Sequence, residues 1–200
     1  MHIAEGVLSP AVLSAGAVLA CAGTAIGLKK LDYDRIMGVG MLCSAFFVAS
    51  LVHIPVGVAS AHFLGTGLLG VMLGWAAFPA ILVALVLQAL LFQFGGLVVL
   101  GVNASTMGFA AVLTHYVFRC LTGLLPGPRG RSFAAFACGA LGVTLAAIFT
   151  AGALALTDEG FVAAAAALLV AHLPIMLAEG VITMFTVTFM SRVRPEILPQ

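Results

Sequence analysis

The most restrictive feature of the sequence is a stretch from residue 36 to residue 118 that contains no Asp, Glu, Lys or Arg. Across the 200 residues, 63% are hydrophobic and 8% are charged, and the mean hydropathy is +1.25. A soluble domain carries about 25% charged residues, so this chain could not cover a surface that faces water. Apolar runs of roughly 20 residues are long enough to cross a bilayer as helices. We therefore predict an all-α integral membrane protein.

Charged residues and clusters of glycine and proline divide the chain into about seven predicted transmembrane helices. Ser9 and Pro10 are typical of a helix start, with serine as the N-cap and proline in the first turn. Pro174 is expected to kink the last helix. We expect one domain, in which residues 1–9 precede a helical bundle over residues 10–194. The predicted helices span residues 10–28, 36–52, 62–74, 76–93, 103–124, 132–156 and 161–191.

The Lys and Arg residues predict an orientation in the membrane. If the chain crosses seven times, all of them fall at helix ends on the side of the C-terminus. One connection on the opposite side carries Asp158 and Glu159. Because Lys and Arg collect on the cytoplasmic side, we expect the N-terminus outside and the C-terminus in the cytoplasm. The basic residues are Lys29, Lys30, Arg35, Arg119, Arg129, Arg131, Arg192 and Arg194.

Two function classes are disfavoured by absent motifs. The sequence has no Gly-x-x-x-x-Gly-Lys-Ser/Thr loop, so nucleotide hydrolysis by that route is not expected. The formal net charge is only +1, and no basic patch of useful size exists for a nucleic acid partner.

The start lacks the basic region of a signal peptide, so we expect Met1 to be retained.

The first two residues offer three nitrogen donors for a metal ion. The amine of Met1 and the amide of His2 would close a five-membered ring on a metal, and that amide with the His2 imidazole would close a six-membered ring. Tetragonal nitrogen sites suit Ni(II) or Cu(II). His62 is the candidate fourth donor, and His53 is its competitor or a partner that orients a ligand. The alternative is that these histidines are hydrogen-bonded interfacial residues.

Other polar residues could support such a site on the outer side. In the glycine-rich connection after residue 92, Gln93 and Asn103 flank glycines that would let the backbone approach closely. Ser60 and Glu5 are further candidates for second-sphere or alternative ligands. Glu179 is a carboxylate within the apolar last helix, where burial of a charge costs free energy. We expect a structural role for it, as a hinge or a packed ion pair.

Three stretches resemble the CbiM/NikM family, the substrate-binding membrane subunits of energy-coupling-factor transporters for cobalt and nickel. They are MHIAEG at the start, VASAHFLGTGLLG around His62, and LQALLFQFGGLVVLGVNASTMG over residues 87–108. The resemblance implies a seven-helix fold whose N-terminus folds back into the protein. It implies metal ligands at Met1, His2 and His62, and no enzymatic activity.

The resemblance also implies partners and a location. Family members work with a transmembrane coupling subunit and a pair of cytoplasmic ATPases, often with a small accessory membrane protein. The expected location is the inner membrane of a prokaryotic cell. Cobalt-associated members often have a Ser/Cys-rich stretch before the internal histidine and a proline after it. Here residues 59–61 read Ala-Ser-Ala and Phe63 follows, which favours nickel as the bound substrate, with cobalt for cobalamin biosynthesis as the alternative.

Two hypotheses of another class remain open at this point. An intramembrane zinc-dependent enzyme would need a His-Glu-x-x-His pair or a general-base carboxylate near the metal, and Glu5 is the only nearby acid. A metal permease that carries its own coupling would need charged residues in several spans, and only Glu179 clearly qualifies.

Overall fold

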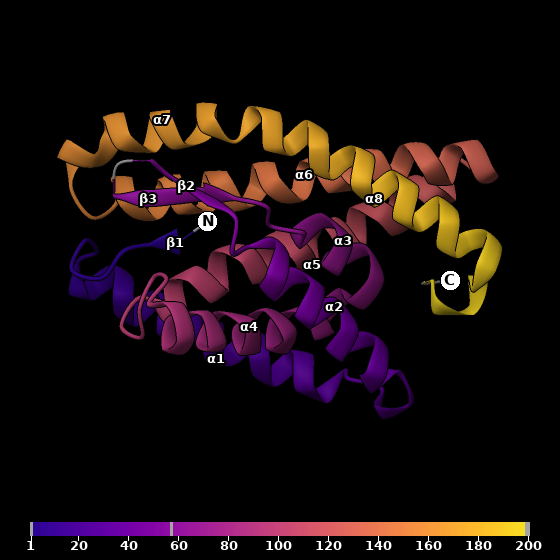
Figure 1. Ribbon diagram of the computed structural model, residues 1–200, viewed down its shortest axis with the longest axis horizontal. Helices are drawn as coiled ribbons and strands as arrows, with labels where there is room; N and C mark the ends of the chain where they lie inside the picture. Colours follow the sequence, from indigo (N-terminus) through magenta and orange to yellow (C-terminus); the bar gives the residue numbers. More distant parts are fainter. Residues whose placement is uncertain (1, 57, 199–200) are drawn as a thin grey trace.

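The computed structural model of the protein describes residues 2–56 and 58–198, with the backbone alone for residues 53–56, 61 and 196. Helices dominate, and a small sheet lies among them (Figure 1). The elements are, in chain order, β1 (His2–Ile3), α1 (Pro10–Lys29), η1 (Tyr33–Arg35), α2 (Ile36–Ala49), β2 (His53–Val56), β3 (Ala59–His62), α3 (Thr66–Leu73), η2 (Gly74–Ala76), α4 (Ala77–Phe92), α5 (Leu100–Leu124), α6 (Pro128–Ala155), η3 (Glu159–Phe161), α7 (Val162–Ala171), α8 (Leu173–Val193) and η4 (Pro195–Ile197).

The described residues contain five helical stretches that are long and apolar enough to cross a membrane. They are Pro10–Lys29, Thr66–Phe92, Leu100–Leu124, Pro128–Ala155 and Glu159–Val193. The predicted helices at 62–74 and 76–93 form one of these stretches, joined through η2. Helix α2 has 14 residues and is therefore about 21 Å long, shorter than the roughly 30 Å hydrocarbon core of a bilayer. The chain is thus a multi-pass helical membrane protein.

The sequence-based prediction missed a three-stranded sheet with the order β1-β3-β2. The helix predicted from residue 62 begins instead at Thr66, because residues 59–62 are extended and pair on both sides. Gly65 precedes α3 in the left-handed conformation, with a φ of 59°. One partner of β3 is the chain start, so local sequence patterns could not show this pairing.

The ends of two helices follow from serine and proline. Ser9 is the N-cap of α1, where its hydroxyl accepts from the Val12 N–H, and Pro10 is the first helical residue, as predicted. The last predicted helix divides at His172 into α7 and α8. Pro174 lies in the first turn of α8, where its missing N–H is not needed. The kink expected at this proline is therefore a boundary between two helices.

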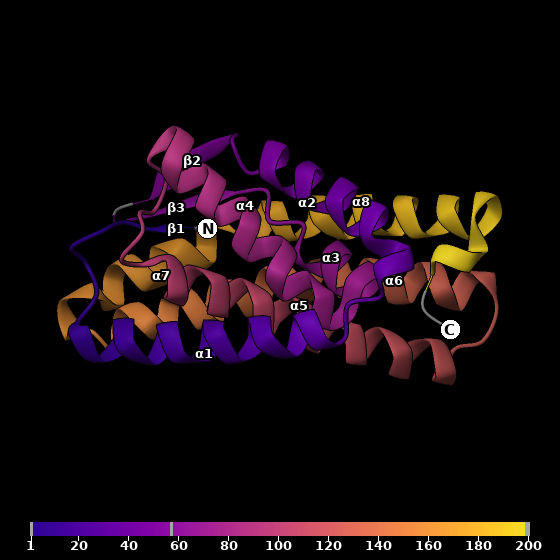
Figure 2. The same cartoon turned by 90° about the horizontal axis from the view of Figure 1, so that it is seen from below.

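Helix α6 packs along α8 and α5, while α1 and α4 lie on the opposite side of the molecule (Figures 1 and 2). Glycines allow the closest approaches. A Cβ atom added at Gly67 of α3 would lie 2.4 Å from the carbonyl oxygen of Cys138 in α6, and one at Gly142 would lie 2.4 Å from the Gly67 nitrogen. Backbones that approach this closely are typical of helix contacts in membranes.

We expect Gly67→Ala to destabilise the protein, because the new methyl group would meet backbone atoms of α6 that have no rotamer to change. Overpacking of this kind costs about 1–3 kcal/mol, which thermal unfolding in detergent would detect as a lower midpoint. Gly40→Ala in α2 is the matched control, since a Cβ atom there meets nothing within 4 Å. Equal midpoints for the two variants would contradict the packing described here.

Candidate metal site

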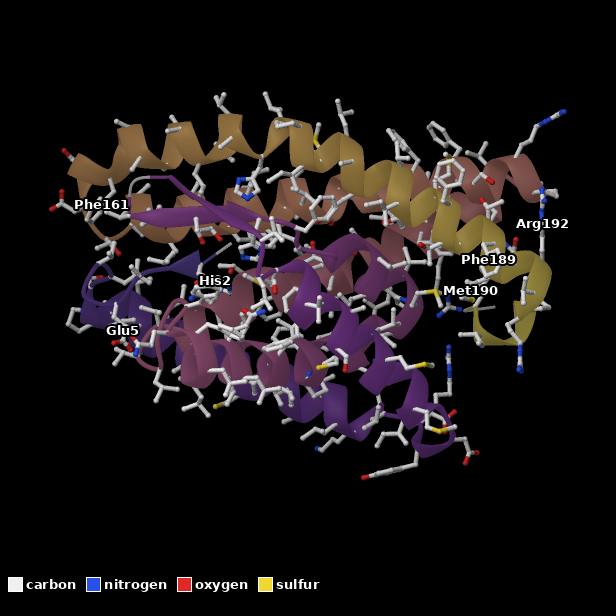
Figure 3. All side chains as sticks on the ribbon, in the orientation of Figure 1. His2, Glu5, Phe161, Phe189, Met190 and Arg192 are labelled. Atoms are coloured by element: carbon white, nitrogen blue, oxygen red, sulfur yellow. The ribbon has the colours of Figure 1, made fainter. Side chains whose placement is uncertain are left out.

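The sheet brings the start of the chain to His62. Strands β1 and β3 are antiparallel, with His2 opposite Ser60 and Ile3 opposite Ala59. His62 lies two residues beyond Ser60 and therefore on the same face of β3, diagonal to His2. The ring centroids of His2 and His62 are 4.5 Å apart. Figure 3 shows His2 inside the molecule beside the strands.

Both imidazoles are buried, with exposed fractions of 5% for His2 and 2% for His62. The Nδ1 atom of His62 lies 2.7 Å from the carbonyl oxygen of Phe63. A carbonyl only accepts hydrogen bonds, so Nδ1 carries the proton and Nε2 keeps a lone pair. Burial lowers the pKa of His62 to about 4. His62 is therefore neutral at pH 7, which is the form that binds metals.

Asn103 of α5 holds the backbone next to His2. Its side-chain oxygen accepts from the Ile3 N–H at 3.1 Å, and its amide nitrogen lies 3.4 Å from the Ile3 carbonyl oxygen, to which it donates. The Ala4 N–H donates to the Val58 carbonyl at 3.2 Å. Asn103 and Ile3 are both buried. The residues that follow His2 are thus fixed on two sides, by α5 and by the chain just before β3.

The connection between α4 and α5 lies against the chain start. Gly95 and Gly96 have φ values of 73° and 120°, which favour glycine. A Cβ atom at Gly95 would lie 3.6 Å from the His2 Cβ, and one at Gly96 would lie 2.2 Å from the Glu5 Cγ. Glu5 accepts a hydrogen bond from the Val98 N–H at 2.9 Å. The close backbone approach expected of this glycine-rich connection is confirmed.

The structure brings some of the predicted residues together and leaves others apart. His2, Ser60, His62 and Asn103 meet where β1, β3 and α5 converge. Glu5 lies at the edge of this region (Figure 3) and contacts the α4–α5 connection. The side chain of Gln93 is exposed, so it does not belong to the buried group.

Two of the predicted residues are described partly or not at all. His53 pairs with His62 in the ladder between β2 and β3, and only its backbone is described. Met1 lies outside the described residues. Among the described residues, His, Cys, Asp and Glu form no group of three or more. The predicted site would not form such a group, because it has two imidazoles and its other donors are the terminal amine and a backbone amide.

The contact of Glu179 with the segment after His62 was missed by sequence reasoning. One carboxylate oxygen accepts hydrogen bonds from the N–H groups of Leu64 and Gly65, the latter at 2.9 Å. Glu179 is 2% exposed. A lone carboxylate in an apolar helix indicates an important residue. Nothing in the sequence, however, indicates that its partners are the backbone N–H groups of Leu64 and Gly65.

The comparisons with known proteins agree with this fold. A solved structure described as the crystal structure of a transition metal transporter superimposes with a TM-score of 0.83 and 28% identity, over 96% of this chain and 93% of that one. The chain is accordingly a transport protein of the membrane. Over residues 2–197 it matches the family CbiM, the cobalt uptake substrate-specific transmembrane region, and it belongs to that family.

Relatives carry related names over nearly all of this chain. A "Putative metal transport protein" of Haemophilus influenzae is 39% identical over 99% of this chain and 97% of its own length. A cobalt transport protein CbiM of Sorangium cellulosum is 34% identical over 99% and 94%. A "Putative fused nickel transport protein NikMN" of Archaeoglobus fulgidus is 31% identical over 100% and 68%. The protein is thus a cobalt/nickel uptake component of the membrane and not an enzyme.

We expect Asn103→Ala to weaken metal binding, because it removes both contacts that hold Ile3 beside His2. Loss of a residue that orients a ligand typically costs about 10- to 100-fold in metal affinity. Calorimetric titration with Ni²⁺ and Co²⁺ would measure the loss. Gln93→Gly is the control, since glycine keeps the left-handed backbone of this exposed position; its affinity should equal that of the wild type. A loss for Gln93→Gly as large as that for Asn103→Ala would contradict the assignment.

Proposed function

We propose that the protein captures Ni²⁺ at the outer face of the membrane as the substrate-binding subunit of an energy-coupling-factor transporter. The observation that carries this proposal is the buried pair of His2 and His62, held where the chain start joins an internal strand. The ligands are the Met1 amine, the amide and imidazole of His2, and Nε2 of His62. Residues 1–9 form the metal-binding segment of a single domain whose helical bundle spans 10–194.

The chemistry of the donors favours nickel over cobalt. A deprotonated amide, an amine and two imidazoles form a square of nitrogen ligands, which suits Ni(II). The hydrogen bond of His62 Nδ1 to Phe63 leaves Nε2 for the metal, and the Ala-Ser-Ala sequence before His62 is the departure that favours nickel. Co²⁺ is the alternative substrate at the same ligands, and relatives are named for each metal.

In the proposed topology the chain crosses the inner membrane of a prokaryotic cell seven times, with the N-terminus outside and the C-terminus in the cytoplasm. This count takes α3 and α4, which η2 joins, as two crossings, α7 with α8 as one, and the short α2 as one. The positive-inside rule supports this orientation. Figure 3 places Arg192 and Phe161 at opposite ends of the long axis, with His2 and Glu5 on the side of Phe161. The metal would therefore enter from the end that lies away from Arg192.

The energy for uptake is proposed to come from other subunits. The sequence has no loop of the Gly-x-x-x-x-Gly-Lys-Ser/Thr type, so ATP hydrolysis falls to a pair of cytoplasmic ATPases. A transmembrane coupling subunit would connect them to this chain, with a small accessory membrane protein as a further partner. The relative in Archaeoglobus fulgidus is described as a fused transport protein, which supports an association with a further transport component.

A spectroscopic titration of purified protein with a native start, using Ni²⁺ and Co²⁺ separately, tests this proposal. We expect one Ni²⁺ per chain and a diamagnetic, square-planar signal, because four in-plane nitrogens enforce that geometry. His2→Ala, His62→Ala and a form with residues added before Met1 should each lose the signal. Tight Co²⁺ binding with weak Ni²⁺ binding would reverse the choice of metal, and binding that is indifferent to His2 would refute the chelate.

Metal affinity is expected to fall steeply in acid. An α-amino group has an ordinary pKa of about 7.7–8.0, and the amide must also lose its proton to bind. Burial lowers the pKa of His62 to about 4, so His62 adds little to this balance near pH 7. The His2 imidazole, with an ordinary pKa of about 6.5, must also be neutral to bind. Each pH unit below 7 should therefore lower the affinity by about 100- to 1000-fold, since two to three protons compete with the metal. Calorimetry in buffers of different ionisation enthalpy counts these protons. Release of only one would exclude the amide as a ligand.

A further inference from the structure

We propose that Glu179 is a positioning residue for the metal, which holds the segment carrying His62 in place from α8. This inference rests on the proposed function, in which His62 is a metal ligand, and it adds a residue that positions that ligand. Glu179 itself does not touch the metal in this proposal. It acts through the backbone that connects β3 to α3.

The hydrogen bonds of Glu179 fall directly after the ligand. Its carboxylate accepts from the N–H groups of Leu64 and Gly65, and Leu64 is fully buried. Phe63 stands between them and His62, and its carbonyl accepts from His62 Nδ1. A continuous series of contacts therefore runs from α8 through the backbone of residues 63–65 to the imidazole ring.

The backbone that leads into α3 has no side-chain cap of its own. Gly65 precedes α3 in a left-handed conformation. The first N–H groups of a helix lack intrahelical partners. Glu179 supplies from another helix the acceptor that the local sequence does not provide.

Helix α8, which carries Glu179, packs tightly against α6. A Cβ atom added at Gly139 of α6 would lie 2.6 Å from the Glu179 carbonyl oxygen, so the backbones of α6 and α8 touch at this level. Gly142, one turn further along α6, is in the same kind of contact with Gly67 of α3. Helix α6 thus holds both the helix that carries the carboxylate and the helix that follows the metal-binding strand.

A simple packing role does not require a carboxylate. Ionisable side chains within a membrane are costly and tend to be functional, and an apolar residue would fill the same volume at lower cost. Among the described residues, the second carboxylate oxygen of Glu179 has no hydrogen-bond partner. One oxygen therefore makes both contacts with the loop, and we expect the reach of the side chain to matter more than its charge.

Two substitutions separate reach from charge. Glu179→Gln keeps the length and an accepting oxygen but removes the charge, whereas Glu179→Asp keeps the charge and withdraws the oxygen by one methylene. We expect Glu179→Asp to bind Ni²⁺ about 10- to 100-fold more weakly than wild type, with a shifted d–d absorption band. Glu179→Gln should bind within about threefold of wild type and retain the band. Thr183→Val, one turn along α8 at a buried site that touches Gly139, controls for altered helix packing and should bind like wild type.

The measurement is a titration with Ni²⁺ alone, paired with thermal unfolding of each metal-free variant. Glu179→Asp binding like wild type, or Glu179→Gln binding as weakly as Glu179→Asp, would overturn the positioning role. An equal loss for Thr183→Val would also overturn it, because general packing would then explain the effect. His62→Ala is measured in parallel. If wild type binds no Ni²⁺, the proposed capture of nickel fails. Wild-type binding that is lost in His62→Ala, with no effect of Glu179→Asp, refutes only the inference about Glu179.

Discussion

The pairing of β1 with β3 is the interaction on which the rest of the site depends. It joins residues 2 and 3 to residues 59 and 60, and a strand of two residues makes too few hydrogen bonds to persist alone, since each contributes only about 0.5–1.5 kcal/mol net. Its permanence comes from the surroundings. Ile3 is fully buried, and Asn103 satisfies both of its backbone groups. The chain start therefore behaves as part of the folded core.

Glycine close contacts turn this local arrangement into a fixed scaffold. Gly67 and Gly142 let α3 and α6 touch, and Gly95 and Gly96 let the α4–α5 connection lie against residues 2–5. A binding site needs ligands that are held by rigid elements and by a supporting layer of contacts. Here the supporting layer consists of helices that approach closely because glycine has no side chain, so its rigidity comes from backbone contact.

Sequence reasoning reached the helices and the chemistry of the terminus but not their meeting point. Continuous apolar runs and a Ser-Pro helix start are local signals, and the start of α1 at Pro10 is confirmed. The nitrogens of residues 1 and 2 could be weighed as ligands from bond counting alone. The sheet and the contact of Glu179 with Leu64 join residues that are far apart in the chain. With one sequence and no local signature, only the resemblance to a family indicated that the terminus folds back.

The same rigidity sets the problem that uptake must solve. In the proposed coordination a deprotonated amide of His2 and the buried ring of His62 hold the metal, so its release requires the β1–β3 pairing to open. If β1 also moves away from α5, Ile3 separates from Asn103, and each buried N–H or C=O group left without a partner costs about 1–3 kcal/mol. The freed amine and amide take up protons at neutral pH and so offset part of that cost, but the pairing must open before they can do so. The work of release must therefore be done on the helices that carry the scaffold, and α8, whose Glu179 holds the segment after His62, is the helix through which a force would reach the site most directly.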